Sequence, residues 1–219
     1  MTTVDGRRAF EDALQRDRAV AVVRAPQYGD GAAIAAGLAE GGIGTVEFTL
    51  TGANALEAIE RAAEVPGAFV GAGSVRSVEQ GRRAVDAGAR FLVSPARVAA
   101  LAHADLGVPV VLAGWTPTEL VEAFALTGGP VKLFPVSTGG LAHLKAVAAP
   151  LPDVPLLPSG GIDAGNAAAY LAAGAVAVNL GSSLCHVPAV VDGDAAELRR
   201  RAQLVRDAID RGPDGEVAG

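Results

Sequence analysis

Cysteine is almost absent from this sequence, and its scarcity removes several kinds of chemistry. The 219 residues include one cysteine, Cys185, so the chain can form neither an internal disulfide nor a zinc site built on cysteines. The three histidines show no metal-ligand spacing, and we expect no bound metal. The sequence has no long apolar span and no signal-peptide pattern at its N-terminus. These features predict a soluble, cytoplasmic protein without membrane contact.

Blocks of positive charge are missing as well. The formal net charge is −6, and basic residues are dispersed along the chain. This distribution argues against nucleic acid or an anionic membrane as the main partner. An anionic small molecule would need a local basic or backbone-amide site. We therefore expect a small-molecule substrate.

Aromatic residues make up only 4% of the chain, whereas half of its residues are hydrophobic. A core of valine, leucine, isoleucine and alanine suits helices packed on a parallel sheet. The length allows one large α/β domain or two small ones.

Short apolar runs with strand character recur along the chain, separated by segments with helical spacing. Several helical segments end in glycine, at Gly42, Gly88 and Gly174, as left-handed helix C-caps require. The eight runs are AVAVVR at 19–24, GTVEFT at 44–49, AFVG at 68–71, RFLVS at 90–94, VPVVL at 108–112, PVKLF at 130–134, VPLL at 154–157 and VAVNL at 176–180.

Eight such units predict a (β/α)8 barrel. We expect a single domain over residues 1–219, with an extra N-terminal helix at 5–18 and a frayed tail at 213–219. An open doubly wound sheet is the alternative. It usually has fewer strands and a glycine-rich fingerprint after the first strand, and this sequence has no such fingerprint.

Lysine is rare, and one of the two lysines stands in an unusual place. Lys132 lies in a short apolar run bounded by Pro130 and Pro135. Burial of an ammonium group is costly, and a lysine amine that is neutral near pH 7 can attack a ketone to form a Schiff base. Alternatively, the side chain extends from a strand end to water. Lys145 lies in a helix-like segment, where solvation is the simpler interpretation.

Glu47 is a second charged residue in a run that should be mostly buried, flanked by Val46 and Phe48. A lone buried carboxylate is destabilising unless it is paired or functional. In a (β/α)8 barrel the active site lies where strands end and the following loops begin. If Glu47 faces Lys132 there, they form an acid/base and nucleophile pair. A buried salt bridge is the structural alternative.

Two glycine–serine turns, 159–161 (Ser-Gly-Gly) and 181–183 (Gly-Ser-Ser), follow the seventh and eighth runs. Glycines let backbone amides approach an anion, and serines add hydroxyl donors. Each turn alone is a weak signal, but together, after strands seven and eight of a barrel, they predict a phosphate site.

Six motifs in family order resemble the 2-keto-3-deoxy-6-phosphogluconate (KDPG) / 4-hydroxy-2-oxoglutarate aldolases. They are VEFT at 46–49, VGAGSV at 70–75, FLVSP at 91–95, TPTEL at 116–120, VKLFP at 131–135 and PSGGI at 158–162. The resemblance implies a class I aldolase on a (β/α)8 barrel, usually a homotrimer, that needs no cofactor. It would cleave KDPG reversibly to pyruvate and glyceraldehyde 3-phosphate.

The resemblance also implies roles for individual residues. Lys132 matches the Schiff-base lysine, and Glu47 matches the general acid/base. The implied substrate-binding residues are Arg24, Thr51, Ser74, Pro95 and Ser159, and the implied phosphate-binding residues are Gly160, Gly161, Gly181 and Ser182.

The chain departs from the family pattern at Thr51, where many members carry an arginine that contacts the substrate carboxylate. The departure leaves 2-keto-3-deoxy-6-phosphogalactonate and 4-hydroxy-2-oxoglutarate as alternative substrates, although the hydroxyl of Ser159 favours the phosphogluconate type. A phosphosugar epimerase would also use a phosphate site after strands seven and eight, but it would not need Lys132. A non-catalytic binding or structural trimer is the remaining alternative.

Overall fold

The computed structural model describes residues 4–213 and alternates strands with helices along the chain. Of the tail predicted at 213–219, residues 214–219 lie outside the described part. The strands are β1 (Ala19–Val23), β2 (Thr45–Thr49), β3 (Phe69–Gly73), β4 (Leu92–Val93), β5 (Val110–Val111), β6 (Ala113–Gly114), β7 (Val131–Leu133), β8 (Leu156–Pro158) and β9 (Val178–Leu180). The helices are α1 (Val4–Asp17), α2 (Gly31–Glu40), α3 (Ala55–Ala63), α4 (Val78–Asp86), α5 (Ala99–His103), α6 (Pro117–Thr127), the 3-10 helix η1 (Val136–Thr138), α7 (Gly140–Ala148), α8 (Ala167–Ala172), α9 (Val187–Asp192) and α10 (Ala195–Arg211).

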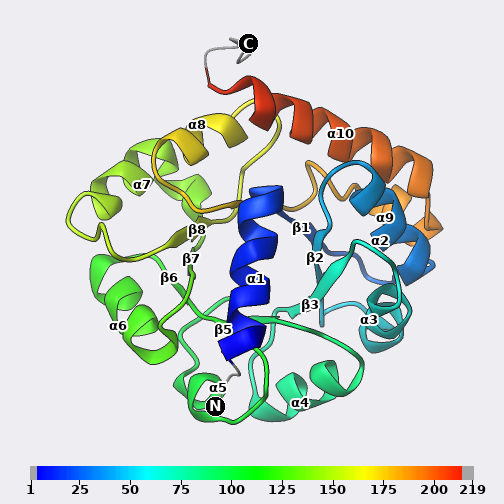
Figure 1. Ribbon diagram of the computed structural model, residues 1–219, viewed down its shortest axis with the longest axis horizontal. Coiled ribbons are helices and arrows are strands. Elements are labelled where there is room, and N and C mark those ends of the chain that lie inside the picture. Colours follow the sequence, from blue (N-terminus) through cyan, green and yellow to red (C-terminus); the bar gives the residue numbers. More distant parts are fainter. Residues whose placement is uncertain (1–3, 214–219) are drawn as a thin grey trace.

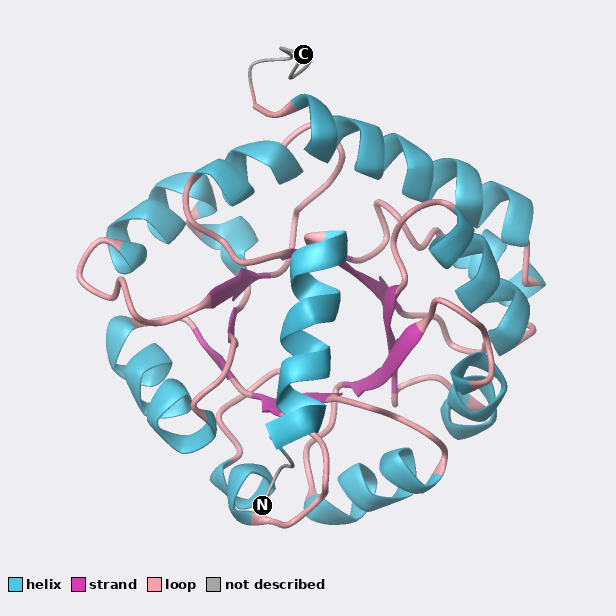
Figure 2. Ribbon diagram, in the orientation of Figure 1, coloured by secondary structure: helices cyan, strands magenta, loops and turns pink. Residues whose placement is uncertain are grey.

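The strands form a curled parallel sheet with helices around its outside (Figures 1 and 2). One sheet has the order β5-β4-β3-β2-β1-β9, and a second has the order β6-β7-β8. Every strand pair is parallel. The chain therefore has the α/β architecture that the alternating runs predict, because each crossover helix buries its apolar face on the sheet.

The fifth predicted strand differs from the expectation of one continuous run. Residues 108–112 contribute only β5, and β6 follows after the single residue Leu112. β5 pairs with β4, whereas β6 pairs with β7, with Ala113 opposite Lys132. The chain thus changes hydrogen-bonding partners at Leu112, a change that the apolar pattern alone does not reveal.

Glycines end several of the helices as predicted. Gly42, Gly88 and Gly174 have φ angles of 90°, 99° and 100°, a left-handed conformation that glycine adopts without steric cost.

Helix α1 packs against the N-terminal ends of the strands. The Phe10 ring stacks on Phe91 at a centroid distance of 4.7 Å and on Phe69 at 6.0 Å. These rings form a separate apolar cluster with inward-facing residues such as Val93 and Leu157. The cluster closes this end of the sheet's interior, so the opposite end, where the strands finish, is the one available for a site.

Candidate active site

Lys132 and Glu47 face each other inside the curled sheet. The Lys132 Nζ lies 3.9 Å from the Glu47 Oε1, and the two side chains are 5% and 0% exposed. Lys132 is the central residue of β7, and Glu47 is the central residue of β2. These strands belong to different sheets and are separated by many residues, so the curl of the sheet brings the two side chains together.

Gly73 in β3 makes room for the Glu47 carboxylate, and Gly71 makes room for the Phe91 ring. A Cβ atom at Gly73 would lie 1.8 Å from the Glu47 Oε1, and one at Gly71 would lie 2.5 Å from the Phe91 ring. Neither position tolerates a side chain without displacing its neighbour, because real Cβ atoms do not approach other atoms this closely. The VGAGSV motif therefore positions the carboxylate next to Lys132.

The Glu47 carboxylate is buried without hydrogen bonds to either oxygen. Burial raises the pKa of the Glu47 carboxyl above its usual range, and the positive charges of Lys132 and then Arg24 oppose this increase. A raised pKa makes the carboxyl a better proton acceptor once it is ionised, and a carboxyl that can accept and return a proton suits general acid–base chemistry.

A pocket of about 360 Å³ opens above Lys132 and contains most of the predicted site. Gly160 and Gly161 have φ angles of 101° and 73°, and a Cβ atom at Gly181 would meet no atom within 4 Å. The two glycine–serine turns lie at the same end of the sheet as Lys132, because residues of both turns line one pocket with it. Of the predicted site residues, the pocket is lined by Arg24, Lys132, Ser159, Gly160, Gly161, Gly181 and Ser182.

Arg24 lies beside Ser74 at the end of the first and third strands. The Arg24 Nη2 is 3.4 Å from the Ser74 Oγ, and Ser74 has a φ angle of 59°. A non-glycine residue in this left-handed region carries backbone strain of the kind that often occurs at functional sites.

Four predicted site residues are not among those that line this pocket, namely Glu47, Thr51, Ser74 and Pro95. Thr51 is exposed, and its hydroxyl hydrogen-bonds with the Thr49 hydroxyl at 2.9 Å. Pro95 is half-buried in the loop after β4. Their predicted contact with substrate stays a prediction.

Besides Ser183, which belongs to the predicted turn 181–183, sequence reasoning missed three residues of this region. Asn179, in the centre of β9, is 1% exposed, and its polar position in an apolar run is the same signal that identified Glu47. Phe134 places its ring 5.5 Å from the Lys132 Nζ, within reach of a cation–π interaction. Asp163 and Ser183 also line the pocket, and the Ser183 hydroxyl donates to the Ile162 carbonyl at 2.6 Å, which joins the two turns.

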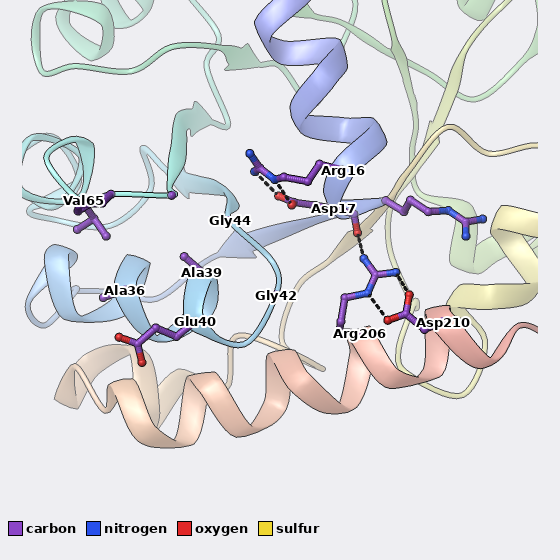
Figure 3. A pocket seen from close by; sticks show the side chains of 13 residues that line it. Arg16, Asp17, Ala36, Ala39, Glu40, Gly42, Gly44, Val65, Arg206 and Asp210 are labelled. Carbon is purple, nitrogen blue, oxygen red and sulfur yellow. Dashed lines mark hydrogen bonds and ion pairs between the residues drawn. The ribbon is translucent and has the colours of Figure 1, made fainter. Parts of the chain in front are cut away.

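A larger hollow of about 900 Å³ lies at the other end of the strands, around Arg16, Asp17 and Arg206 (Figure 3). Its charged groups bind one another: Arg16 pairs with Asp17, and Arg206 pairs with Asp210. The smaller pocket is the better candidate because it is lined by Lys132, which pairs with the buried Glu47, and by the glycine turns. Within residues 4–213, no helix is long and apolar enough to cross a membrane, and no cluster of three or more potential metal ligands occurs.

Comparisons with known proteins agree with this geometry. Residues 10–201 match the family model described as "Aldolase: KDPG and KHG aldolase". The chain is 35% identical over 217 residues to 2-dehydro-3-deoxy-phosphogluconate aldolase of Pseudomonas aeruginosa, covering 96% of this chain and 97% of the relative. It is also 35% identical over 201 residues to the protein of the same name from Treponema pallidum, covering 88% and 93%.

A solved structure shows a similar fold. It is the KDPG aldolase of Legionella pneumophila with pyruvate captured at low pH as a covalent carbinolamine intermediate, at 27% identity. The TM-score is 0.79, and the match covers 89% of this chain and 97% of that one. The chain therefore belongs to the KDPG and KHG aldolase family, whose members are carbon–carbon lyases.

Proposed function

We propose that this chain is a class I aldolase that cleaves KDPG reversibly to pyruvate and glyceraldehyde 3-phosphate. The observation that carries the proposal is the buried pair of Lys132 and Glu47, 3.9 Å apart, beneath a pocket bordered by two glycine–serine turns. The names of the relatives from P. aeruginosa and T. pallidum support the same substrate.

Lys132 is the nucleophile in this mechanism. After its ammonium loses a proton, the amine attacks the C2 ketone of the substrate, and proton transfers convert the tetrahedral adduct into a carbinolamine. Loss of water then leaves a protonated imine between the Lys132 Nζ and C2. The carbinolamine captured with pyruvate in the Legionella structure supports this course.

Glu47 moves the protons. As a carboxylate it accepts the proton of the C4 hydroxyl, directly or through a water molecule, while the C3–C4 bond breaks and its electrons flow into the imine. The aldehyde leaves, and the enamine that remains takes a proton at C3 from the Glu47 carboxyl. Water then hydrolyses the pyruvyl imine to release pyruvate and regenerate Lys132. Because the protonated imine is the electron sink, the reaction needs no metal or organic cofactor.

The remaining polar groups of the pocket are proposed to hold the two charged ends of the substrate. Arg24 and Ser74 lie 3.4 Å apart and offer donors to the carboxylate, with Thr51 and Pro95 as further candidates. Ser159 offers a hydroxyl close to Lys132. Gly160, Gly161, Gly181 and Ser182 offer backbone amides and a hydroxyl to the phosphate, which glycines allow to approach closely.

The same chemistry fits the related substrates 2-keto-3-deoxy-6-phosphogalactonate and 4-hydroxy-2-oxoglutarate. The hydroxyl of Ser159 in the pocket favours the phosphogluconate type. A phosphosugar epimerase gives no reason for a buried lysine beside a buried carboxylate, and a purely structural trimer gives none for a carboxylate without hydrogen bonds.

We also propose that the curled sheet closes into a (β/α)8 barrel with α1 as an extra N-terminal helix. A parallel bridge between Ser159 and Asn179 links the end of β8 to β9, and Leu112 alone separates β5 from β6, so the strand neighbours run in a circle. A homotrimer in the cytoplasm follows from the family resemblance and is tested by light scattering and by cell fractionation.

The decisive experiment measures retro-aldol activity on KDPG, its phosphogalactonate epimer and 4-hydroxy-2-oxoglutarate side by side. We expect the highest kcat/KM on KDPG. A preference for an unphosphorylated substrate would refute the phosphate assignment, and no activity on any of the three would refute the aldolase assignment.

A further inference from the structure

We propose that Asn179 is a positioning residue that, together with Glu47, holds a buried water molecule through which protons reach the substrate. This inference rests on the proposed aldolase function and adds to it a group that neither the motifs nor the family resemblance identified.

The first observation concerns unpartnered polar atoms. Among the residues that the structure describes, four buried side-chain nitrogen or oxygen atoms lack a hydrogen-bond partner, and they are both oxygens of Glu47 and both amide atoms of Asn179. Glu47 is 0% exposed, and Asn179 is 1% exposed. Buried polar groups are nearly always paired, so four unpaired atoms on two residues call for a shared partner.

Strand register places the two residues in one layer. Inward-pointing side chains of a (β/α)8 barrel form layers of four from alternate strands, and the strand tilt displaces each layer by one residue per strand. Lys132 is opposite Leu157, and the bridge between Ser159 and Asn179 puts Leu157 level with Ala177. Because β9 is two strands from β7, the layer is displaced by two residues toward the C-terminal end of β9. Asn179, two residues after Ala177, is therefore the neighbour of Lys132 in its layer.

The same rule leads from Asn179 to Glu47. Asn179 is opposite Val20 on β1, and the pairing of Ala21 with Val46 puts Val20 level with Thr45. The layer is again displaced by two residues, so its member on β2 is Glu47, two residues after Thr45. A third application gives Val93, because Glu47 is opposite Gly71 and Ala72 is opposite Leu92. The layer thus contains three polar side chains and one apolar one, and the measured distance of 3.9 Å between Lys132 and Glu47 agrees with it.

The chemistry of these groups fits a single water molecule. A buried water typically makes two to four hydrogen bonds. The Asn179 amide can donate through Nδ2 and accept through Oδ1, whereas the Glu47 carboxylate only accepts when ionised. A water held between them can donate to Glu47 and accept from Asn179. Its position beside Lys132 lets it relay protons between Glu47 and the reacting atoms.

The charged and titratable groups that face Glu47 affect its pKa and therefore the interpretation of its pH titration. Lys132 and Arg24 face it with positive charge. The Cys185 thiol also interacts with Glu47, but burial raises the pKa of Cys185 far above its usual range, so that it stays neutral. Loss of the Asn179 donor removes support from the anionic carboxylate only, so the pKa of Glu47 should rise further.

The test compares Asn179→Leu, which is similar in size but apolar, with Asn179→Ser, whose hydroxyl can still hold water. Val93→Ala is the matched control, because it alters the packing of the same layer without changing a polar group. We expect Asn179→Leu to lower kcat about 10- to 100-fold, because loss of the water removes its hydrogen bond to the Glu47 carboxylate, with KM nearly unchanged. The acid limb of kcat should move to higher pH, Asn179→Ser should recover most of the activity, and Val93→Ala should leave the limb in place.

A second readout does not depend on turnover. The infrared carbonyl band of the protonated Glu47 carboxyl, assigned by its loss in Glu47→Gln, should titrate at higher pH in Asn179→Leu than in the wild type. An unchanged titration and an unchanged acid limb in folded Asn179→Leu overturn the inference. If Asn179→Leu does not fold, the same measurement is made on Asn179→Ala. An unchanged infrared titration of Glu47 in that variant overturns the inference. An inactive wild type refutes the aldolase assignment, while the infrared titration still decides whether Asn179 acts on Glu47.

Discussion

Two buried carboxylates at opposite ends of the strands have opposite surroundings. Asp17, at the N-terminal end, accepts hydrogen bonds from the Thr45 amide at 2.6 Å, the Thr45 hydroxyl at 2.7 Å and the Arg16 guanidinium at 2.6 and 2.9 Å. Its backbone carbonyl also accepts from Arg206 at 2.7 Å (Figure 3). Glu47 accepts no hydrogen bond, and its nearest cation, Lys132, is 3.9 Å away.

This difference indicates that Asp17 serves the stability of the fold, whereas Glu47 serves the proposed reaction. A carboxylate with several donors holds the fold together, because each donor repays part of its cost of burial. A buried carboxylate without donors weakens the fold, and such a cost is retained where the group is needed for reaction. The N-terminal end is therefore expected to respond to mutation in unfolding experiments, and the C-terminal end in kinetic ones.

The largest expected effect is at Lys132. Lys132→Ala should abolish measurable retro-aldol activity, because the lysine paired with Glu47 among residues 4–213 is Lys132, while the variant still folds. Borohydride reduction with pyruvate should add a pyruvate-derived mass to the Lys132 peptide of the wild type and to none in the variant. Lys145→Ala is the control and should behave as wild type. An adduct on Lys145 would overturn the mechanism.

Glu47→Gln should lower kcat by about 10²- to 10⁴-fold, the usual contribution of a positioned general acid–base group. Trapping of pyruvate by borohydride should still occur, more slowly, since Lys132 is present. Steady-state kinetics together with mass spectrometry measure both. Wild-type kcat in this variant would mean that Glu47 only pairs with Lys132.

Asp17→Ala should lower the stability of the fold and leave kcat unchanged, the opposite of Glu47→Gln. Loss of the acceptor leaves the buried Thr45 amide unsatisfied and leaves the Thr45 hydroxyl with only the Ala13 carbonyl, at 3.4 Å. We expect the free energy of unfolding to fall by about 3 kcal/mol. Urea denaturation measures this change, and kcat of the folded variant should match the wild type. A large fall in kcat at unchanged stability would contradict the assignment of Asp17 to stability rather than to catalysis.

Gly181→Val should raise KM for KDPG about tenfold, equivalent to about 1.4 kcal/mol of binding, and leave KM for 4-hydroxy-2-oxoglutarate nearly unchanged. The new side chain enters open space in the pocket. This position is a better probe than Gly161, whose φ angle of 73° would strain any other residue. Gly129→Val, also free of neighbours at its Cβ position but outside the pocket, is the control. Equal increases for both substrates would refute the phosphate site.

The smallest expected effect is a pH-dependent gain in stability in Glu47→Gln. The pKa of Glu47 is raised in the folded protein by burial. Its contribution to stability is therefore fully present below the unfolded-state pKa of about 4.3 and is lost as the pH rises through the folded-state pKa. The Tm of Glu47→Gln relative to wild type should therefore rise as the pH increases from about 4 through the raised folded-state pKa of Glu47. A difference between the Tm values of Glu47→Gln and wild type that stays constant with pH would contradict the raised pKa of Glu47.

Local sequence patterns were sufficient for several features. The apolar runs and the glycines at 42, 88 and 174 predicted the strand positions and the helix ends, because strand burial and left-handed caps depend on residues close in sequence. A charged residue inside an apolar run identified Lys132 and Glu47 for the same reason. Each of these signals concerns the environment of one segment.

Relations between segments depended on the tertiary structure. The change of partner at Leu112, the fit of the Glu47 carboxylate against Gly73 and the 3.9 Å approach to Lys132 all arise from strands that are distant in sequence. Asn179 was missed because a single asparagine in a strand becomes informative only when its amide is seen to be buried without a partner. The sequence by itself determined which segments become strands and placed a lysine and a glutamate, the proposed catalytic residues, inside two of them. The curl and register of the sheet decided which of those residues meet, because side chains from different strands come together only where strand pairing and tilt align them.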